Sequence, residues 1–220
     1  MAPGPSRRVF FLHGFASSAG STKAAYFRQK LAPLGVTFRC PDLNEPDFTT
    51  LTMTRMLEQL GDELAGGDPG VPATLIGSSL GGTLAILASA RFADRIDRLV
   101  LLAPAVMFAK PGDPMLPPER IEEWRRAGSF RFFHYAYGEE RPLGFTFYED
   151  SFDYDAFNAQ IVQPTLVFQG MRDTSVDYRT VEQFAQARAN VTLSLLDDDH
   201  QLMASLPRIW NDVAPFLELV

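Results

Sequence analysis

The sequence lacks several features that would place it in large classes of protein. Its 220 residues include a single cysteine, Cys40, so we expect no disulfide within the chain and no cysteine-rich zinc site. No stretch of about 18 apolar residues is present, which argues against a membrane-spanning helix. The first eight residues contain no apolar segment of the kind that a signal peptide needs. These absences predict a cytoplasmic protein.

Runs of basic residues are also missing. The chain has 20 Lys and Arg against 27 Asp and Glu, which gives a formal net charge of −7. The pairs Arg7-Arg8 and Arg125-Arg126 are too short to form a basic patch and are interpreted as solvated surface residues. An acidic chain without such a patch repels the phosphate backbone of nucleic acids. We therefore expect no nucleic-acid partner.

What the sequence does contain is an alternation of short apolar runs and helical periods. Most runs are continuous, which is typical of strands buried on both faces of a parallel sheet. The runs lie at residues 9–12, 36–38, 73–76, 99–102, 165–168 and 191–196. Between them, residues 53–64 and 206–217 carry apolar side chains at helical spacing. This order predicts an α/β fold, with a mostly parallel central sheet and helices on both of its faces.

One segment interrupts this alternation. Residues 105–160 connect two predicted core strands and are too numerous for a plain loop. They hold 13 of the 26 aromatic residues of the chain. We predict a short helix at 119–126 and two β-segments, at 130–137 and 145–148, joined by a hairpin loop.

The strongest chemical signal lies between a predicted strand and a predicted helix. Gly77-Ser78-Ser79-Leu80-Gly81 matches G-x-S-x-G, whose small residues permit a sharp turn that lifts the serine hydroxyl clear of the backbone. The helix N-terminus adds a positive dipole end where negative charge develops. Ser79 alone fits this frame and is the candidate nucleophile. The alternative interpretation is a glycine-rich turn that merely caps the helix.

A serine hydroxyl needs a base, and the chain offers His13, His134 and His200. In hydrolases with this turn, the chain order is serine, acid, histidine. His200 is the candidate base because it follows both Ser79 and the last predicted core strand. The alternative is a surface histidine in an acidic loop, since residues 197–199 are all aspartates.

The acid is expected in the turn after the preceding strand, which contains two aspartates. Asp173 lies three residues after Gly170, at the turn itself. Asp177 stands just before the helical pattern of residues 178–188, where it is a plausible N-cap. We favour Asp173 as the acid and keep Asp177 as the alternative.

Two backbone N–H groups are expected to form an oxyanion hole. The residue after the nucleophile, Leu80, supplies one, and the loop after an early strand supplies the second. His13-Gly14-Phe15 occupies that loop, so Phe15 is the predicted second donor. Gly14 would permit a tight turn, and His13 would then support the loop rather than act as the base.

These segments together resemble the α/β-hydrolase superfamily. The segments HGF-x-SS at residues 13–18, GS-x-K at 20–23 and GSSLGG at 77–82 are similar to small bacterial esterases of the YqiA type. They are also similar to the depalmitoylating thioesterases of the mitochondrial α/β-hydrolase-domain group. The resemblance implies an α/β-hydrolase fold that is trimmed at its first antiparallel strands. Many such relatives carry Val-Pro after the acid, where this chain has Val176-Asp177.

In that family an insertion after the fourth predicted strand forms a cap over the active site. The resemblance therefore implies a core made of residues 1–104 and 161–220 and a small cap at 105–160. Its aromatic side chains would form an apolar acyl or aryl pocket. The candidate substrate-binding residues are Phe130, Phe132, Phe133 and Tyr135. The alternative is that these side chains only pack the insertion onto the core.

The sequence thus predicts a serine carboxylesterase that works through an acyl-enzyme on a small-molecule ester or thioester, with no metal and no organic cofactor. An acyl-protein thioesterase or depalmitoylase is the first alternative, and a non-catalytic binder on the same fold is the second. Lys23, within GS-x-K, receives no function from the sequence. The oligomeric state and the preferred acyl length stay open.

Overall fold

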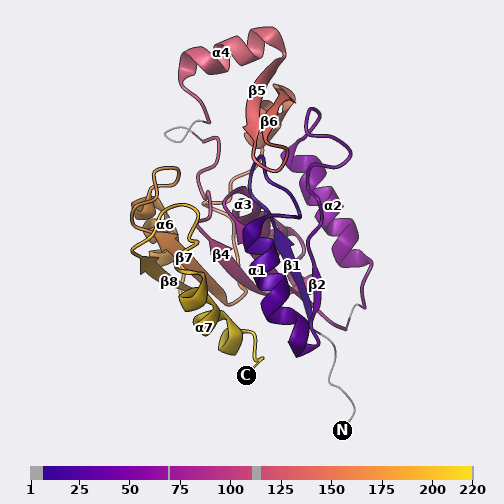
Figure 1. Ribbon diagram of the computed structural model, residues 1–220, viewed down its shortest axis with the longest axis vertical. Coiled ribbons are helices and arrows are strands. Elements are labelled where there is room, and N and C mark those ends of the chain that lie inside the picture. Colours follow the sequence, from indigo (N-terminus) through magenta and orange to yellow (C-terminus); the bar gives the residue numbers. More distant parts are fainter. Residues whose placement is uncertain (1–6, 69, 111–114, 220) are drawn as a thin grey trace.

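Parallel strands form the centre of the molecule (Figure 1). The computed structural model describes residues 7–68, 70–110 and 115–219, and within these ranges one six-stranded sheet has the order β2-β1-β3-β4-β7-β8. All of its strand pairs are parallel. The strands are β1 (Arg8–Leu12), β2 (Thr37–Arg39), β3 (Ala73–Ser78), β4 (Ile96–Leu102), β7 (Thr165–Gly170) and β8 (Val191–Leu196). Each apolar run found in the sequence forms one of these strands.

Helices cover both faces of this sheet. Side chains alternate along a strand, so Val9 and Phe11 of β1 point to one face and Phe10 and Leu12 to the other. The first face packs against α1 (Thr22–Leu31) and α7 (Leu206–Phe216). The second packs against α2 (Met53–Ala65), α3 (Leu80–Arg91) and α6 (Tyr178–Gln186). The predicted α/β fold, with a mostly parallel sheet and helices on both faces, is confirmed.

Local signals set where these helices begin and end. Ser21 caps α1 by accepting a hydrogen bond from the N–H of Ala24, and Thr52 caps α2 in the same way. Short 3-10 turns, Ala32–Leu34 and Ala93–Arg95, follow α1 and α3. Pro215 lies inside α7, one residue before its end. No helix in the described part of the chain is long and apolar enough to cross a membrane.

The insertion forms a separate layer at one end of the molecule, away from both chain termini (Figure 1). It contains α4 (Pro118–Ala127), β5 (Ser129–His134), β6 (Glu139–Gly144) and α5 (Thr146–Ser151). The helix predicted at 119–126 and the first β-segment are observed. Residues 111–114 of the insertion lie outside the described residues.

The second predicted β-segment is wrong. Residues 145–148 do not form a strand; they lead into and form the start of α5, and the strand that pairs with β5 is β6. The reversal comes earlier, because Gly138 adopts φ +67° just before β6. Phe147 and Ser151 are both buried and lie four residues apart, which is helical spacing. Aromatic residues are common in strands, so the aromatic content of residues 145–148 predicted a strand where the chain forms a helix.

Hydrogen bonds tie this layer to the core at its base. The N–H of Tyr135 donates to the carbonyl of Ala16, and the N–H of Gly144 donates to that of Thr49, both over 2.8 Å. Trp124 of α4 is fully buried and donates from its indole nitrogen to the carbonyl of Leu143 over 2.9 Å. The β5–β6 hairpin is therefore fixed over the loop that follows β1.

Candidate active site

Ser79 occupies the sharp turn between β3 and α3. It adopts φ +53° and ψ −117°, a region in which a side-chain-bearing residue costs about 1–3 kcal/mol. Its N–H donates to the carbonyl of Leu102 over 3.0 Å, which fixes the turn to β4. A Cβ at Gly77 would lie 2.3 Å from the carbonyl oxygen of Gly81, and one at Gly81 would lie 2.0 Å from that of Leu12. The neighbouring backbone therefore leaves no room for a side chain at either glycine of the motif.

His200 and Asp173 form a hydrogen-bonded pair. The Nδ1 of His200 donates to Oδ2 of Asp173 over 2.8 Å, and the side chain of Asp173 is fully buried. Burial alone would raise the pKa of Asp173, but hydrogen bonds, led by those from His200 and the N–H of Val176, hold this pKa below its usual value. The carboxylate is therefore ionised at neutral pH and orients the imidazole.

The remaining acceptor positions of Asp173 are also filled. Its Oδ1 accepts the N–H groups of Ser175 and Val176, each over 2.8 Å. Its Oδ2 also accepts the side-chain amide of Gln169 over 2.9 Å. Gln169 was missed by the sequence reasoning, since a glutamine at a strand end carries no motif.

Asp177 lies in the same loop but does a different job. Its side chain is 55% exposed and caps α6 by accepting the N–H of Arg179 over 3.0 Å. The structure thus brings Asp173 to His200 and leaves Asp177 at the start of a helix.

The two predicted oxyanion donors lie in segments that flank Ser79, the candidate nucleophile. Leu80 is the first residue of α3, where a backbone N–H has no acceptor within the helix. The loop that contains Phe15 lies close, because a Cβ at Gly14 would stand 3.4 Å from the Cβ of Ser79. Both N–H groups therefore belong to segments that meet at the serine.

The other two histidines lie outside this pair. His13 is buried, with its Nε2 3.0 Å from the N–H of Leu43 and its Nδ1 3.0 Å from the carbonyl of Gly14. It supports the loop after β1. His134 is buried under the hairpin, and its Nε2 lies 3.5 Å from the side-chain oxygen of Asn44. Burial lowers the pKa of His134, so its imidazole is neutral at pH 7.

Ser79, His200 and Phe15 line one cavity of about 1200 Å³. Phe132 and Tyr135 of the insertion also line it. Apolar side chains close one part of the cavity, and the sequence reasoning missed most of them: Phe108, Ala109, Met115 and Leu116. The hydrophobic run of residues 105–109 was the available signal for this wall.

Two of the four predicted substrate-binding aromatics lie elsewhere. Phe130 packs against Trp124, with ring centroids 6.4 Å apart, and under the guanidinium of Arg120. Phe133 is 51% exposed and contacts the ring of Tyr135. Tyr135 follows the end of β5 at His134 and lines the cavity, whereas Phe133 does not.

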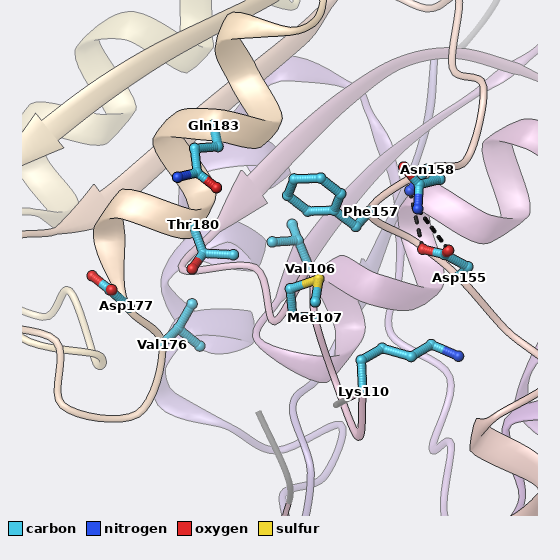
Figure 2. Close-up of a pocket in the computed structure, with 10 residues that line it drawn as sticks. All are labelled: Val106, Met107, Lys110, Asp155, Phe157, Asn158, Val176, Asp177, Thr180 and Gln183. Carbon is cyan, nitrogen blue, oxygen red and sulfur yellow. Dashed lines mark hydrogen bonds between the residues drawn. The ribbon is translucent and has the colours of Figure 1, made fainter. Parts of the chain in front are cut away.

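A second cavity of about 600 Å³ lies beside the first. Figure 2 shows Val106, Met107 and Phe157 at its centre and Thr180 and Gln183 of α6 along one side. Val176 lines both cavities. The two cavities are therefore separated by the loop that holds Asp173 and by the turn at residues 105–110.

Among the described residues, no group of three or more His, Cys, Asp or Glu side chains is placed to hold a metal ion. The aspartates of residues 197–199 have other contacts. Asp197 pairs with Arg172 over 3.2 Å, and Asp198 accepts the N–H of Ser205 over 2.9 Å.

A protein-family model described as "Uncharacterised protein family (UPF0227)" matches residues 8–216. No curated protein matches the chain. Among solved structures, Est1E from Butyrivibrio proteoclasticus has a TM-score of 0.73 and 20% identity, and the match covers 99% of this chain and 90% of that one. Alpha/beta hydrolase domain-containing protein 10 from mouse has a TM-score of 0.74 and 20% identity, over 98% and 91%.

A third solved structure, described as "Putative hydrolase from Agrobacterium vitis S4", has a TM-score of 0.78 and 24% identity. The match covers 95% of this chain and 87% of that one. At these identities the likeness concerns the fold, which is that of the α/β-hydrolases.

Proposed function

Since the chain belongs to the UPF0227 family, whose model spans residues 8–216, and has the α/β-hydrolase fold, we propose that it is a serine hydrolase that cleaves carboxylic esters. One observation carries this proposal. Ser79 in its strained turn and His200 line a single cavity, and the buried Asp173 holds His200 from behind it; the three residues come from three separate strand ends. That arrangement is what a nucleophile, a base and an orienting acid require.

The proposed reaction has two halves. The Oγ of Ser79 attacks the ester carbonyl while Nε2 of His200 takes its proton, and Asp173 holds the imidazolium through Nδ1–H. The N–H groups of Phe15 and Leu80 receive the oxyanion. His200 then gives the proton to the departing alcohol. Water, activated by His200, attacks the acyl-enzyme and releases the acid and free Ser79.

The shape of the cavity supports ester substrates with an apolar acyl part. Phe108, Met115, Leu116 and Phe132 offer apolar surface near the nucleophile. We propose that residues 105–160 act as the cap of this cavity. A structure of Est1E with bound ferulic acid has been solved, and this ligand is a finding about Est1E. A thioesterase or depalmitoylase would use the same residues, and long-chain preference in the test below would favour it.

The test is hydrolysis of p-nitrophenyl esters from acetyl to palmitoyl. Replacing Ser79 by alanine removes the nucleophile, so we expect kcat to fall by about 10⁴- to 10⁶-fold. Ser89→Ala is the matched control, because this serine lies on the same helix and donates to the carbonyl of Ile86. Ester hydrolysis that survives Ser79→Ala would refute the proposal. Fluorophosphonate labelling of the wild type, absent in Ser79→Ala, is the independent readout.

A further inference from the structure

Lys23 is a buried cation that the reaction proposed above does not use. It lies in the first turn of α1, its side chain is 9% exposed, and it lines the cavity that holds Ser79 and His200. Its ammonium group makes no hydrogen bond or ion pair with any residue that the structure describes. Three carboxylates act on this ammonium group, but none of them lies within ion-pair distance of it. A mostly buried cation that lines the cavity in this way points to an anionic ligand.

The carboxylates around Lys23 are already occupied. Asp173 accepts from His200, Gln169 and two backbone N–H groups. Asp198 accepts the N–H groups of Asp199 and Ser205, and Asp199 accepts that of Gln201. Burial lowers the pKa of Lys23 to about 8, while the charges of Asp173, Asp199 and Asp198 oppose this shift. Lys23 therefore keeps its charge at neutral pH.

The cavity wall around Lys23 is polar. The loop before α1 contributes the small hydroxyl residues Ser17, Ser18 and Ser21 to the cavity. Ser21 takes the N–H of Ala24, but the N–H groups of Thr22 and Lys23 have no acceptor within the helix and lie at the positive end of its dipole. A helix N-terminus next to a buried lysine suits a carboxylate or a phosphate.

The place of Lys23 relative to the base indicates which part of the substrate it meets. His200 returns its proton to the leaving group, so the leaving group departs on the side of His200. The charges that act on Lys23 belong to Asp173, which holds His200, and to the two residues before His200. The apolar wall of the cavity comes from other segments, residues 105–116 and β5.

We propose that Lys23 and the first turn of α1 bind an anionic group, a carboxylate or a phosphate, on the leaving group of the ester. This inference rests on the proposed function, because the role of His200 places the leaving group. The enzyme would then favour esters whose alcohol part carries a negative charge and whose acyl part is apolar.

The test compares two acetyl esters that differ in one carboxylate, 4-acetoxybenzoate and phenyl acetate. In Lys23→Met we expect the ratio of kcat/KM for the anionic over the neutral ester to fall about tenfold or more, because a charged hydrogen bond is lost. Lys23→Arg keeps the charge and should retain most of the ratio. Lys30→Met is the matched control, since Lys30 is exposed on the same helix. An unchanged ratio in Lys23→Met would overturn the proposal.

A second pair places the carboxylate on the acyl side: phenyl hemisuccinate against phenyl butyrate. We expect Lys23→Met to leave the ratio for this pair within about twofold, since a solvated charge away from the lysine gains little. A ratio that depends on Lys23 for this pair alone would refute the placement at the leaving group.

The pH dependence of the unmutated protein gives a test that needs no variant. The preference for 4-acetoxybenzoate in kcat/KM should decline as pH rises through about 8, where free Lys23 loses its proton. The pKa values of Asp173 and Asp198 are lowered, so both carboxylates stay ionised in this range. His200 acts on both esters alike, so the ratio isolates Lys23. A ratio that stays constant between about pH 7 and pH 9 would count against the proposal.

Binding separates failure of this inference from failure of the proposed function. Calorimetric titration of Ser79→Ala with 4-acetoxybenzoate should show binding that weakens about tenfold when Lys23→Met is added. Such binding without ester hydrolysis by the wild type would refute the esterase and keep the anion site. Ester hydrolysis without any effect of Lys23 on rates or binding would refute the anion site and keep the esterase.

Discussion

At the scale of single residues, Asp173 and Asp177 lie four positions apart but have different hydrogen-bond partners. Asp173→Asn keeps the shape of the turn but gives His200 the wrong hydrogen-bonding partner, so kcat for p-nitrophenyl butyrate should fall by about 10⁴-fold. Asp177→Asn should leave kcat nearly unchanged, because asparagine is an equally good N-cap for α6. A harmless Asp173→Asn, or a severe Asp177→Asn, would reverse the assignment.

The extent to which residues could be predicted follows from their chemistry. Ser79 and His200 stand in recognisable contexts, a turn motif and a position after the last strand. Gln169 gains its position from a contact within its own loop, the 2.9 Å hydrogen bond to Asp173 four residues later, and Lys23 gains its position from a cavity that distant segments enclose. A single sequence carries no local signal for such contacts, so neither residue received a role.

At the scale of elements, the β5–β6 hairpin brings one aromatic residue to the oxyanion loop. Phe132 contacts Phe15 edge-on, with ring centroids 5.3 Å apart, and lines the cavity. Removing its ring should enlarge the space beside the nucleophile. In Phe132→Ala we expect the ratio of kcat/KM for octanoyl over acetyl p-nitrophenyl esters to rise about tenfold.

Phe133 provides the control for that change. It lies on the same strand but is 51% exposed, so Phe133→Ala should leave the chain-length profile as it is. An equal shift in both variants would mean that the hairpin acts through its general stability and not through the ring of Phe132.

The hydrophobic pattern of the sequence predicts some of the helices and strands but not others. The four inner strands of the sheet, β1, β3, β4 and β7, are mostly apolar and buried on both faces, which is what their sequence pattern predicts, whereas the edge strands β2 and β8 are more exposed. The insertion is different. Residues 145–148 are aromatic, yet they lead into and begin a helix that buries Phe147, whereas the polar residues 139–144 form the strand. Pairing with β5 outweighed local preference there.

At the scale of the whole molecule, His134 connects the insertion to the core and makes stability depend on pH. The ring is fully buried, it stacks on Tyr137, and its Nδ1 has no hydrogen-bond partner within the described residues. Its pKa is lowered in the folded protein, first by burial. The unfolded chain therefore takes up a proton below about pH 6.5 that the folded protein resists.

Stability should consequently be lost as pH falls from about 6.5 towards the lowered pKa of His134. We expect the Tm of the wild type to drop more steeply between about pH 7 and pH 5 than that of His134→Phe, which keeps the ring and removes the titrating group. Thermal unfolding followed by circular dichroism measures the difference. Parallel Tm profiles for the two proteins would show that His134 contributes nothing to this dependence.

The partition between the two cavities has a consequence for how substrate range can change. Val176 holds Asp173 through its backbone N–H, while its side chain lines both cavities. Every amino acid except proline has this N–H. A smaller side chain at this position can therefore join the two cavities, and a larger one can close them from each other, while the hydrogen bond from this N–H to Asp173 is kept. In the proposed esterase, substrate size could thus change at this position without loss of the backbone support of Asp173.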